Sequence, residues 1–242
     1  MNTYNRTLVR WGSVCSVVAG AGWLVPVFFY FFILPAAGSG PTQAADPAGF
    51  LPWMIEHGGL RVALWWTTAI PILIALFGVP LLLKEMLKTY SPCAVRVAAL
   101  AGVIGFFTLL VAALVLAVGE RPLARAYAVA GVEARPAIIA AYEWQRLVTA
   151  ILFDVLGLFL VGAWILVNSL VGLRCGRLPK GCAWFGVITG LLALAFVAGY
   201  VAGVGWLGEG GIGMAAFVAM PVWMIWLGAA LLLRETGDRR QG

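Results

Sequence analysis

The chain has 242 residues, of which 63% are hydrophobic and only 11% are charged. A soluble domain of this length needs more charge on its surface, so the composition excludes an ordinary soluble protein. The net charge of +6 would suggest nucleic acid in a soluble chain, but here the bases act as topology signals, and we expect no nucleic-acid partner.

Six apolar runs of about 20 residues follow one another, and each is long enough to span a hydrocarbon layer of ~30 Å. They lack the alternation of β-barrel strands. The sequence therefore predicts an all-α integral membrane bundle of six transmembrane helices, a single domain over residues 1–242 with no soluble domain. The runs are Trp11–Leu34, Leu60–Leu83, Val97–Val118, Leu147–Leu170, Cys182–Val204 and Met214–Leu233.

The first run is too long for the core of a signal peptide, so we interpret it as a retained anchor, with a kink expected at Pro26. After it, Phe50–His57 is predicted to form a short helix on the outer membrane surface, and Gly58-Gly59 to end that helix. The second run contains Pro71, where we expect another kink.

The segment Gly119–Arg135 after the third run is interpreted as a polar outer excursion that holds a short amphipathic helix. Pro136 suits the first residue of the next helix. If that helix continues unbroken to about Val171, it is roughly 50 Å long and projects beyond the bilayer on the outer side. It carries a carboxylate, Asp154, inside its apolar run.

The turn between the fourth and fifth runs resembles a known family. A Gly-containing apolar run precedes a turn with the pattern Gly-x-Leu-Pro-basic, and a Gly-spaced span follows it. In this chain they are Leu158-Phe159-Leu160-Val161-Gly162, Gly176-Arg177-Leu178-Pro179-Lys180 and Trp184-Phe185-Gly186. The segment resembles an uncharacterised bacterial family of six-span membrane proteins, catalogued as domain of unknown function 4386. The resemblance implies the six-span fold and brings no reaction or binding residue with it.

The second and sixth runs also resemble each other. Ala69-Ile70-Pro71 and the residues to Glu85 align without gaps with Ala219-Met220-Pro221 and the residues to Glu235. The third and fifth runs match in a similar way, which predicts a threefold repeat of helical hairpins. The alternative is chance similarity, because apolar segments draw on few residue types.

The sixteen Lys and Arg residues are unevenly distributed between the two sides of the predicted bundle. Eleven of them belong to the two termini and to the loops after the second and fourth runs, and five lie on the other side. Lys and Arg are enriched on the cytoplasmic side of membrane proteins. We therefore expect a multi-pass protein of the bacterial inner membrane with both termini in the cytoplasm.

Residues for cofactor chemistry are scarce. The chain has one histidine, His57, whereas a haem held between membrane helices usually needs two. The motifs His-Glu-x-x-His and Gly-x-Ser-x-Gly and a phosphate-binding Gly loop are absent. No Cys pair has the Cys-x-x-Cys spacing of a metal or redox site. We expect no cofactor and no metal.

Ionisable groups at membrane depth usually face the bundle interior and pair with one another. We group those near the outer side into a predicted outer polar cluster: Glu56, His57, Arg61, Thr68, Glu143, Arg146 and Asp154. The cluster is interpreted as an ion-pair network that fixes helix packing, as an outward-opening site for a small molecule or lipid headgroup, or as an enzyme site. For Asp154 we expect an ion pair with Arg61 or Arg146. The alternative is a protonated Asp154 that hydrogen-bonds Thr68 or a backbone carbonyl.

The sequence favours a non-enzymatic polytopic membrane protein, either a structural or accessory subunit or a binder of lipids or apolar ligands. Its expected partners are membrane lipids and other transmembrane helices, those of further copies included. The alternative is a small transporter or lipid-handling protein that uses the outer polar cluster, with proline kinks supplying broken helices. A second alternative is an intramembrane enzyme.

The orientation can be tested with Cys93 and Cys175, which lie at the expected cytoplasmic helix ends. A membrane-impermeant thiol reagent added outside intact cells should leave both unlabelled, and both should react once the membrane is opened. Labelling of either residue from outside would overturn the orientation.

Overall fold

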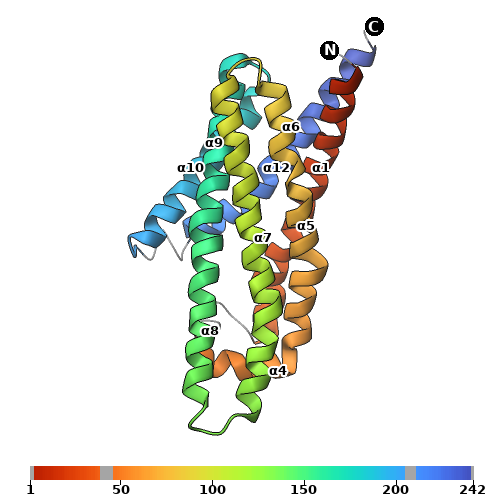
Figure 1. Ribbon diagram of the computed structural model, residues 1–242. Coiled ribbons are helices and arrows are strands. Elements are labelled where there is room, and N and C mark those ends of the chain that lie inside the picture. Colours follow the sequence, from red (N-terminus) through yellow and green to blue (C-terminus); the bar gives the residue numbers. More distant parts are fainter. Residues whose placement is uncertain (1–2, 39–45, 205–210, 241–242) are drawn as a thin grey trace.

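The computed structural model describes residues 3–38, 46–204 and 211–240, and nearly all of these are helical. Six helices are long and apolar enough to cross a membrane, and both termini lie at one end of the bundle (Figure 1). The described ranges contain no strand. The predicted all-α fold with six spans is confirmed, whereas its orientation and the hairpin repeat stay predictions. The spans are Val9–Ala36, Pro47–Leu87, Pro92–Val129, Arg135–Cys175, Lys180–Val201 and Ile212–Leu233.

Three of the spans contain a π-helical segment, in which hydrogen bonds join residues five apart and the helix is wider. Two of these segments end two residues before a proline, Pro35 or Pro71, whose missing N–H frees a carbonyl inside the segment. The elements are α1 (Thr3–Phe28), η1 (Phe29–Ile33), α2 (Leu34–Ala36), α4 (Pro47–Ala63), η2 (Leu64–Ala69), α5 (Ile70–Leu76), α6 (Gly78–Leu87), α7 (Pro92–Val129), α8 (Arg135–Ala150), η3 (Ile151–Gly157), α9 (Leu158–Cys175), α10 (Lys180–Val201) and α12 (Gly211–Arg240).

The spans differ greatly in length. The helix α7 has 38 residues and the fourth span has 41, so they are about 57 and 61 Å long, against about 33 Å for the 22 residues of α10. Part of α7 and the helix α8 therefore extend past α10 at the end opposite the termini, which we call the outer end in keeping with the predicted orientation (Figure 1). The expected long fourth helix is present, and it begins at Arg135, one residue before Pro136.

The helix α7 departs from the prediction, because it does not give way to a polar excursion after Val118 but continues to Val129. Its extension stays helical because the buried stripe of the transmembrane part, which includes Leu109, continues through Glu120 and Ala124. Glu120 contacts Arg61 of α4, and Ala124 packs in one cluster with Phe50 of α4 and Tyr142 of α8. The polar sequence is therefore part of the bundle.

The helix α4 also differs from the predicted surface helix. It begins at Pro47, where the Asp46 side chain caps it by accepting a hydrogen bond from the Ala48 amide, and it continues through Gly58-Gly59 to Ala63. A glycine costs only about 1 kcal/mol in a helix, which packing can offset. Its first turns run across the outer end of the bundle and bury Phe50, among other residues (Figure 1).

Glycines allow the transmembrane helices to approach closely, as small residues commonly do in membranes. A Cβ added to Gly228 of α12 would lie 2.5 Å from the Ser13 carbonyl oxygen of α1. Between α9 and α10, a Cβ added to Gly190 would lie 2.8 Å from the Gly162 carbonyl oxygen. Both contacts involve backbone, so a side chain at either glycine would force the helices apart.

The turn between α9 and α10 shows how the Gly-x-Leu-Pro sequence acts. Gly176 has a φ of +63°, in the left-handed region that glycine adopts most easily, and it ends α9. Leu178 then folds back into the core, where its side chain occupies the space beside Gly172. Pro179 precedes the first residue of α10. The turn is therefore short and tightly packed.

The glycine contacts lead to a stability prediction. Gly228→Ala should lower the free energy of unfolding in detergent by about 1–3 kcal/mol, because the added methyl group overpacks the α1–α12 contact. The matched control is Gly59→Ala, since a Cβ added to this helical glycine meets nothing within 4 Å. Thermal unfolding followed by tryptophan fluorescence would measure both. An unchanged melting temperature for Gly228→Ala would contradict the close α1–α12 contact.

Candidate functional site

The most deeply buried charges near the outer end form one ion pair between α4 and α7. Arg61 Nε donates a hydrogen bond to Glu120 Oε2 at 3.0 Å, and Arg61 Nη2 donates to Glu120 Oε1. Arg61 is 6% exposed and Glu120 is 2% exposed. Two parallel hydrogen bonds to one carboxylate give the pair a fixed geometry.

Aromatic side chains enclose this pair. The guanidinium carbon of Arg61 lies 5.5 Å from the ring centroid of Phe50 and 5.6 Å from that of Trp65. The buried ring of Tyr142 on α8 packs against Phe50, with 5.3 Å between centroids. A cation above aromatic faces is attracted by their quadrupoles, most strongly where water is excluded. Tyr30 of η1 packs against the buried cluster that contains Phe50 and Tyr142.

The first turns of α4 bring Phe50 over the pair. Phe50 and Arg61 are eleven residues apart, close to three helical turns, so they share one helix face. Trp53 ties this part of α4 to the end of the first span, because its indole Nε1 donates to the Ala37 carbonyl oxygen at 2.7 Å. The ion pair therefore joins the second and third spans within a small outer core.

The pair acts as a structural contact. Moving a charge out of water costs several kcal/mol, and only a well-oriented partner offsets that cost. Both oxygens of Glu120 accept from Arg61, and the surrounding rings exclude water. This arrangement fixes the rotation and the depth of α4 against α7.

The other members of the predicted outer polar cluster whose side chains the structure describes form no hydrogen bond or ion pair with Arg61. Glu56, Glu143 and Arg146 are exposed, and His57 stacks on Trp53 with 5.2 Å between ring centroids. Among the described side chains of the set, Arg61 alone is buried. The side chain of Thr68 lies outside the described part of the chain.

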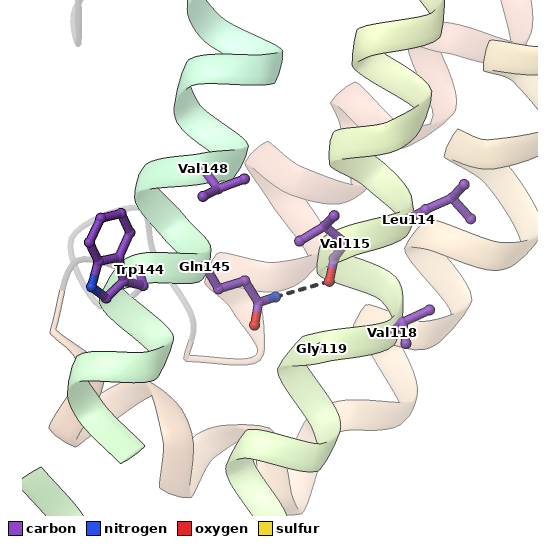
Figure 2. Close-up of a pocket in the computed structure, with 7 residues that line it drawn as sticks. All are labelled: Leu114, Val115, Val118, Gly119, Trp144, Gln145 and Val148. Atoms are coloured by element: carbon purple, nitrogen blue, oxygen red, sulfur yellow. Dashed lines mark hydrogen bonds between the residues drawn. The ribbon is translucent and has the colours of Figure 1, made fainter. Parts of the chain in front are cut away.

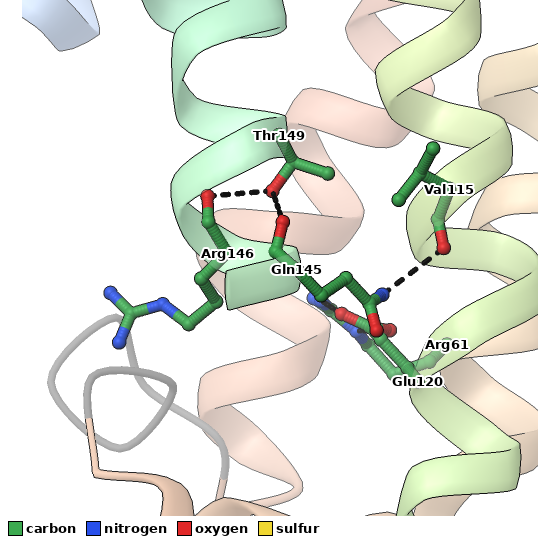
Figure 3. A network of polar contacts seen from close by, with 6 residues as sticks. All are labelled: Arg61, Val115, Glu120, Gln145, Arg146 and Thr149. Carbon is green, nitrogen blue, oxygen red and sulfur yellow. Dashed lines mark hydrogen bonds and ion pairs between the residues drawn. The ribbon is translucent and has the colours of Figure 1, made fainter. Parts of the chain in front are cut away.

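The expected ion pair of Asp154 with Arg61 or Arg146 is wrong. Arg61 is taken by Glu120, and Arg146 is exposed and points away from the ion pair (Figure 3). Asp154 is partly buried in η3 and makes no ion pair or hydrogen bond with the described residues. For Arg61 the physical reason is position, since α4 packs against α7, whereas η3, which continues the helix between α8 and α9, packs against α7 and α10.

A hollow on the outer half of the bundle separates α7 from α8. We call it the α7–α8 groove; it has a volume of about 530 Å³ and is mostly apolar (Figure 2). Its lining consists of Leu114, Val115, Val118, Gly119, Trp144, Gln145 and Val148. Trp144 is 66% exposed and Val118 is 59% exposed, so the groove opens to the outside of the bundle.

Gln145 in the lining of the α7–α8 groove is hydrogen-bonded within the protein. Gln145 Nε2 donates to the Val115 carbonyl oxygen at 3.1 Å, which bridges the two helices (Figure 3). A Cβ added to Gly119 would lie 2.6 Å from Gln145 Oε1, so a side chain at this position would displace the end of Gln145. Thr149 Oγ1 donates to the Gln145 and Arg146 carbonyl oxygens, both at 2.9 Å. The groove therefore presents apolar surface to a ligand, because the amide of Gln145 is already hydrogen-bonded within the protein.

Glu120 is the site residue that sequence reasoning missed. The sequence interpretation places it in the polar outer excursion Gly119–Arg135, outside the apolar run and outside the predicted outer polar cluster. The signal that could have found it is the spacing of Ala113, Ala117, Glu120 and Ala124, which continues one helix face past the apolar run. Within the described residues, no group of three His, Cys, Asp or Glu side chains could hold a metal ion.

Comparisons with protein-family models, with curated proteins and with solved structures found no match. The resemblance of the segment Gly157–Gly190 to the six-span family named above therefore stays a prediction.

The ion pair leads to a double-mutant prediction. Arg61→Gln and Glu120→Gln should each lower the free energy of unfolding by about 3–5 kcal/mol, because each leaves a buried partner uncompensated. The combined change should cost clearly less than the sum. Chemical unfolding in mixed micelles would measure the four proteins.

Arg146→Gln is the matched control, since Arg146 is exposed, and it should change stability by no more than about 0.5 kcal/mol. Strict additivity of the Arg61 and Glu120 changes would show that the two side chains do not interact.

Proposed function

We propose that this multi-pass membrane protein is a non-enzymatic binder of membrane lipid, and that the α7–α8 groove holds a lipid acyl chain. The observation that carries the proposal is the groove itself, because it is apolar, open to the outside of the bundle and within the usual size range of ligand sites. An acyl chain needs apolar surface to lie along and no hydrogen-bond partner.

The position of the groove along the helices supports this proposal. The apolar run Val97–Val118 has 22 residues, or about 33 Å of helix, which matches a hydrocarbon layer of ~30 Å. Leu114 and Val118 are in the last turns of that run, so the groove is at the level of the outer leaflet. Trp144 on the opposite wall suits the membrane interface, where tryptophan is enriched.

The ion pair supports the same proposal, because it faces away from the groove. Glu120 and Val118 are two residues apart on α7, which places them about 160° apart around the helix. Glu120 is buried against Arg61, and Val118 is exposed in the groove wall. The Arg61–Glu120 charges hold the helices, while the outward face of α7 contacts the membrane.

We also propose that the protein resides in the bacterial inner membrane with both termini in the cytoplasm. The uneven distribution of Lys and Arg supports this orientation. The two termini lie at one end of the bundle, as an even number of spans requires (Figure 1). In this orientation the α7–α8 groove opens into the outer leaflet.

Filling the groove tests the proposed function. Photoactivatable phosphatidylcholine with a diazirine in its acyl chain should crosslink preferentially to the groove walls in reconstituted vesicles, as mapped by peptide mass spectrometry. Val118→Trp with Val148→Trp should reduce that crosslinking at least severalfold, because the indoles occupy the groove without displacing core residues.

Val97→Trp with Ile104→Trp is the matched control, since both residues are exposed on α7 and lie outside the groove lining. This control should leave the crosslinking of the groove peptides unchanged. A uniform pattern over all exposed apolar residues would refute the groove as a lipid site.

A further inference from the structure

The face of α7 that lines the groove also carries two exposed arginines, Arg121 and Arg125. Leu114, Val118, Arg121 and Arg125 are spaced by four, three and four residues, so they fall within about 60° of one another around the helix. The first two line the α7–α8 groove. The two arginines follow at its outer end, one and two turns beyond Val118.

Arg121 and Arg125 have no acidic partner among the residues that the structure describes. Of the other arginines at this end, Arg61 pairs with Glu120 and Arg135 lies over the Tyr127 ring at 5.0 Å, whereas Arg146 is exposed on α8 and lies outside the groove lining. No acidic side chain in the described ranges lies within 4.0 Å of either guanidinium group. Two cationic groups are therefore available to an external anion.

The depth of these arginines puts both guanidinium groups within reach of lipid headgroups, because a long helical side chain inclines toward the helix N-terminus, here back toward the bilayer. At 1.5 Å per residue, Arg121 is about 4.5 Å and Arg125 about 10 Å beyond Val118, the last residue of the apolar run. Headgroups occupy the ~5–7 Å on each side of the hydrocarbon layer. An acyl chain in the groove would place its phosphate between the two guanidinium groups.

We propose that the groove selects an anionic glycerophospholipid of the outer leaflet, with an acyl chain in the groove and the phosphate on Arg121 and Arg125. This inference rests on the proposed function and adds the headgroup class. The guanidinium group is suited to the role because it forms paired hydrogen bonds with phosphate oxygens and is always charged. A zwitterionic lipid carries its own cation near the phosphate and gains less from the two arginines.

The experiment compares two photoactivatable lipids, phosphatidylglycerol and phosphatidylcholine, at equal mole fraction in vesicles containing the full chain. The readout is the crosslink yield in the peptides that carry Leu114–Gly119 and Trp144–Val148, so lipids bound at the cytoplasmic basic loops do not contribute. The wild-type ratio should favour phosphatidylglycerol by on the order of tenfold, since basic side chains near a membrane surface attract lipids of net negative charge.

Arg121→Gln with Arg125→Gln should bring this ratio close to one, while phosphatidylcholine still crosslinks. Arg121→Lys with Arg125→Lys keeps both charges and should retain part of the preference. The matched control is Arg135→Gln with Arg146→Gln, which removes the same charge from exposed positions on α8 and should keep the wild-type ratio.

The outcomes separate the two proposals. If neither lipid crosslinks to the groove, the proposed function fails. If both crosslink equally and the Arg121 and Arg125 changes have no effect, the lipid site stands and the headgroup inference fails. If the control lowers the ratio as much as the test variant, general surface charge explains the preference and the inference also fails.

Discussion

The structure depends on one ion pair, because a charge buried in a membrane bundle needs a partner of opposite charge. Arg61 and Glu120 lie at the outer ends of apolar spans, and each is stable there only because the other satisfies it. A two-point contact between planar groups tolerates little displacement, so it sets the rotation and the depth of the second span against the third. The rings of Phe50 and Trp65 surround the guanidinium and so become part of the same contact.

Fixing the inner face of α7 also determines its outer face. With Glu120 directed inward, Val118 must face outward, and the Arg121 and Arg125 side chains follow on the exposed side. One helical segment of about a dozen residues therefore combines a structural charge with a membrane-facing surface. The bridge from Gln145 to the Val115 carbonyl oxygen sets the spacing between this surface and α8. The groove is a consequence of how these two helices are held.

The sequence was sufficient to predict the six spans, because the length of an apolar run is a direct physical requirement of the bilayer. It was not sufficient to predict the charge pairing. Spacing gives the relative rotation of residues within one helix, but not the rotation of one helix against another, so Asp154 could not be distinguished from Glu120 as the partner of Arg61. The groove was also beyond prediction, since it depends on the missing side chain at Gly119 and on the rotamer of Gln145.

The sequence separation within the ion pair bears on how the protein is made. Arg61 and Glu120 are 59 residues apart, so at ~5–20 residues per second the ribosome adds the glutamate about 3–12 s after the arginine. During that interval the second span must be held in the membrane with an uncompensated cation. Arg61 lies at the end of the apolar run, so its unpaired charge costs little there, because the long side chain can reach the water boundary. The depth that allows the pair to be buried in the finished bundle thus also permits its two halves to enter the membrane one after the other.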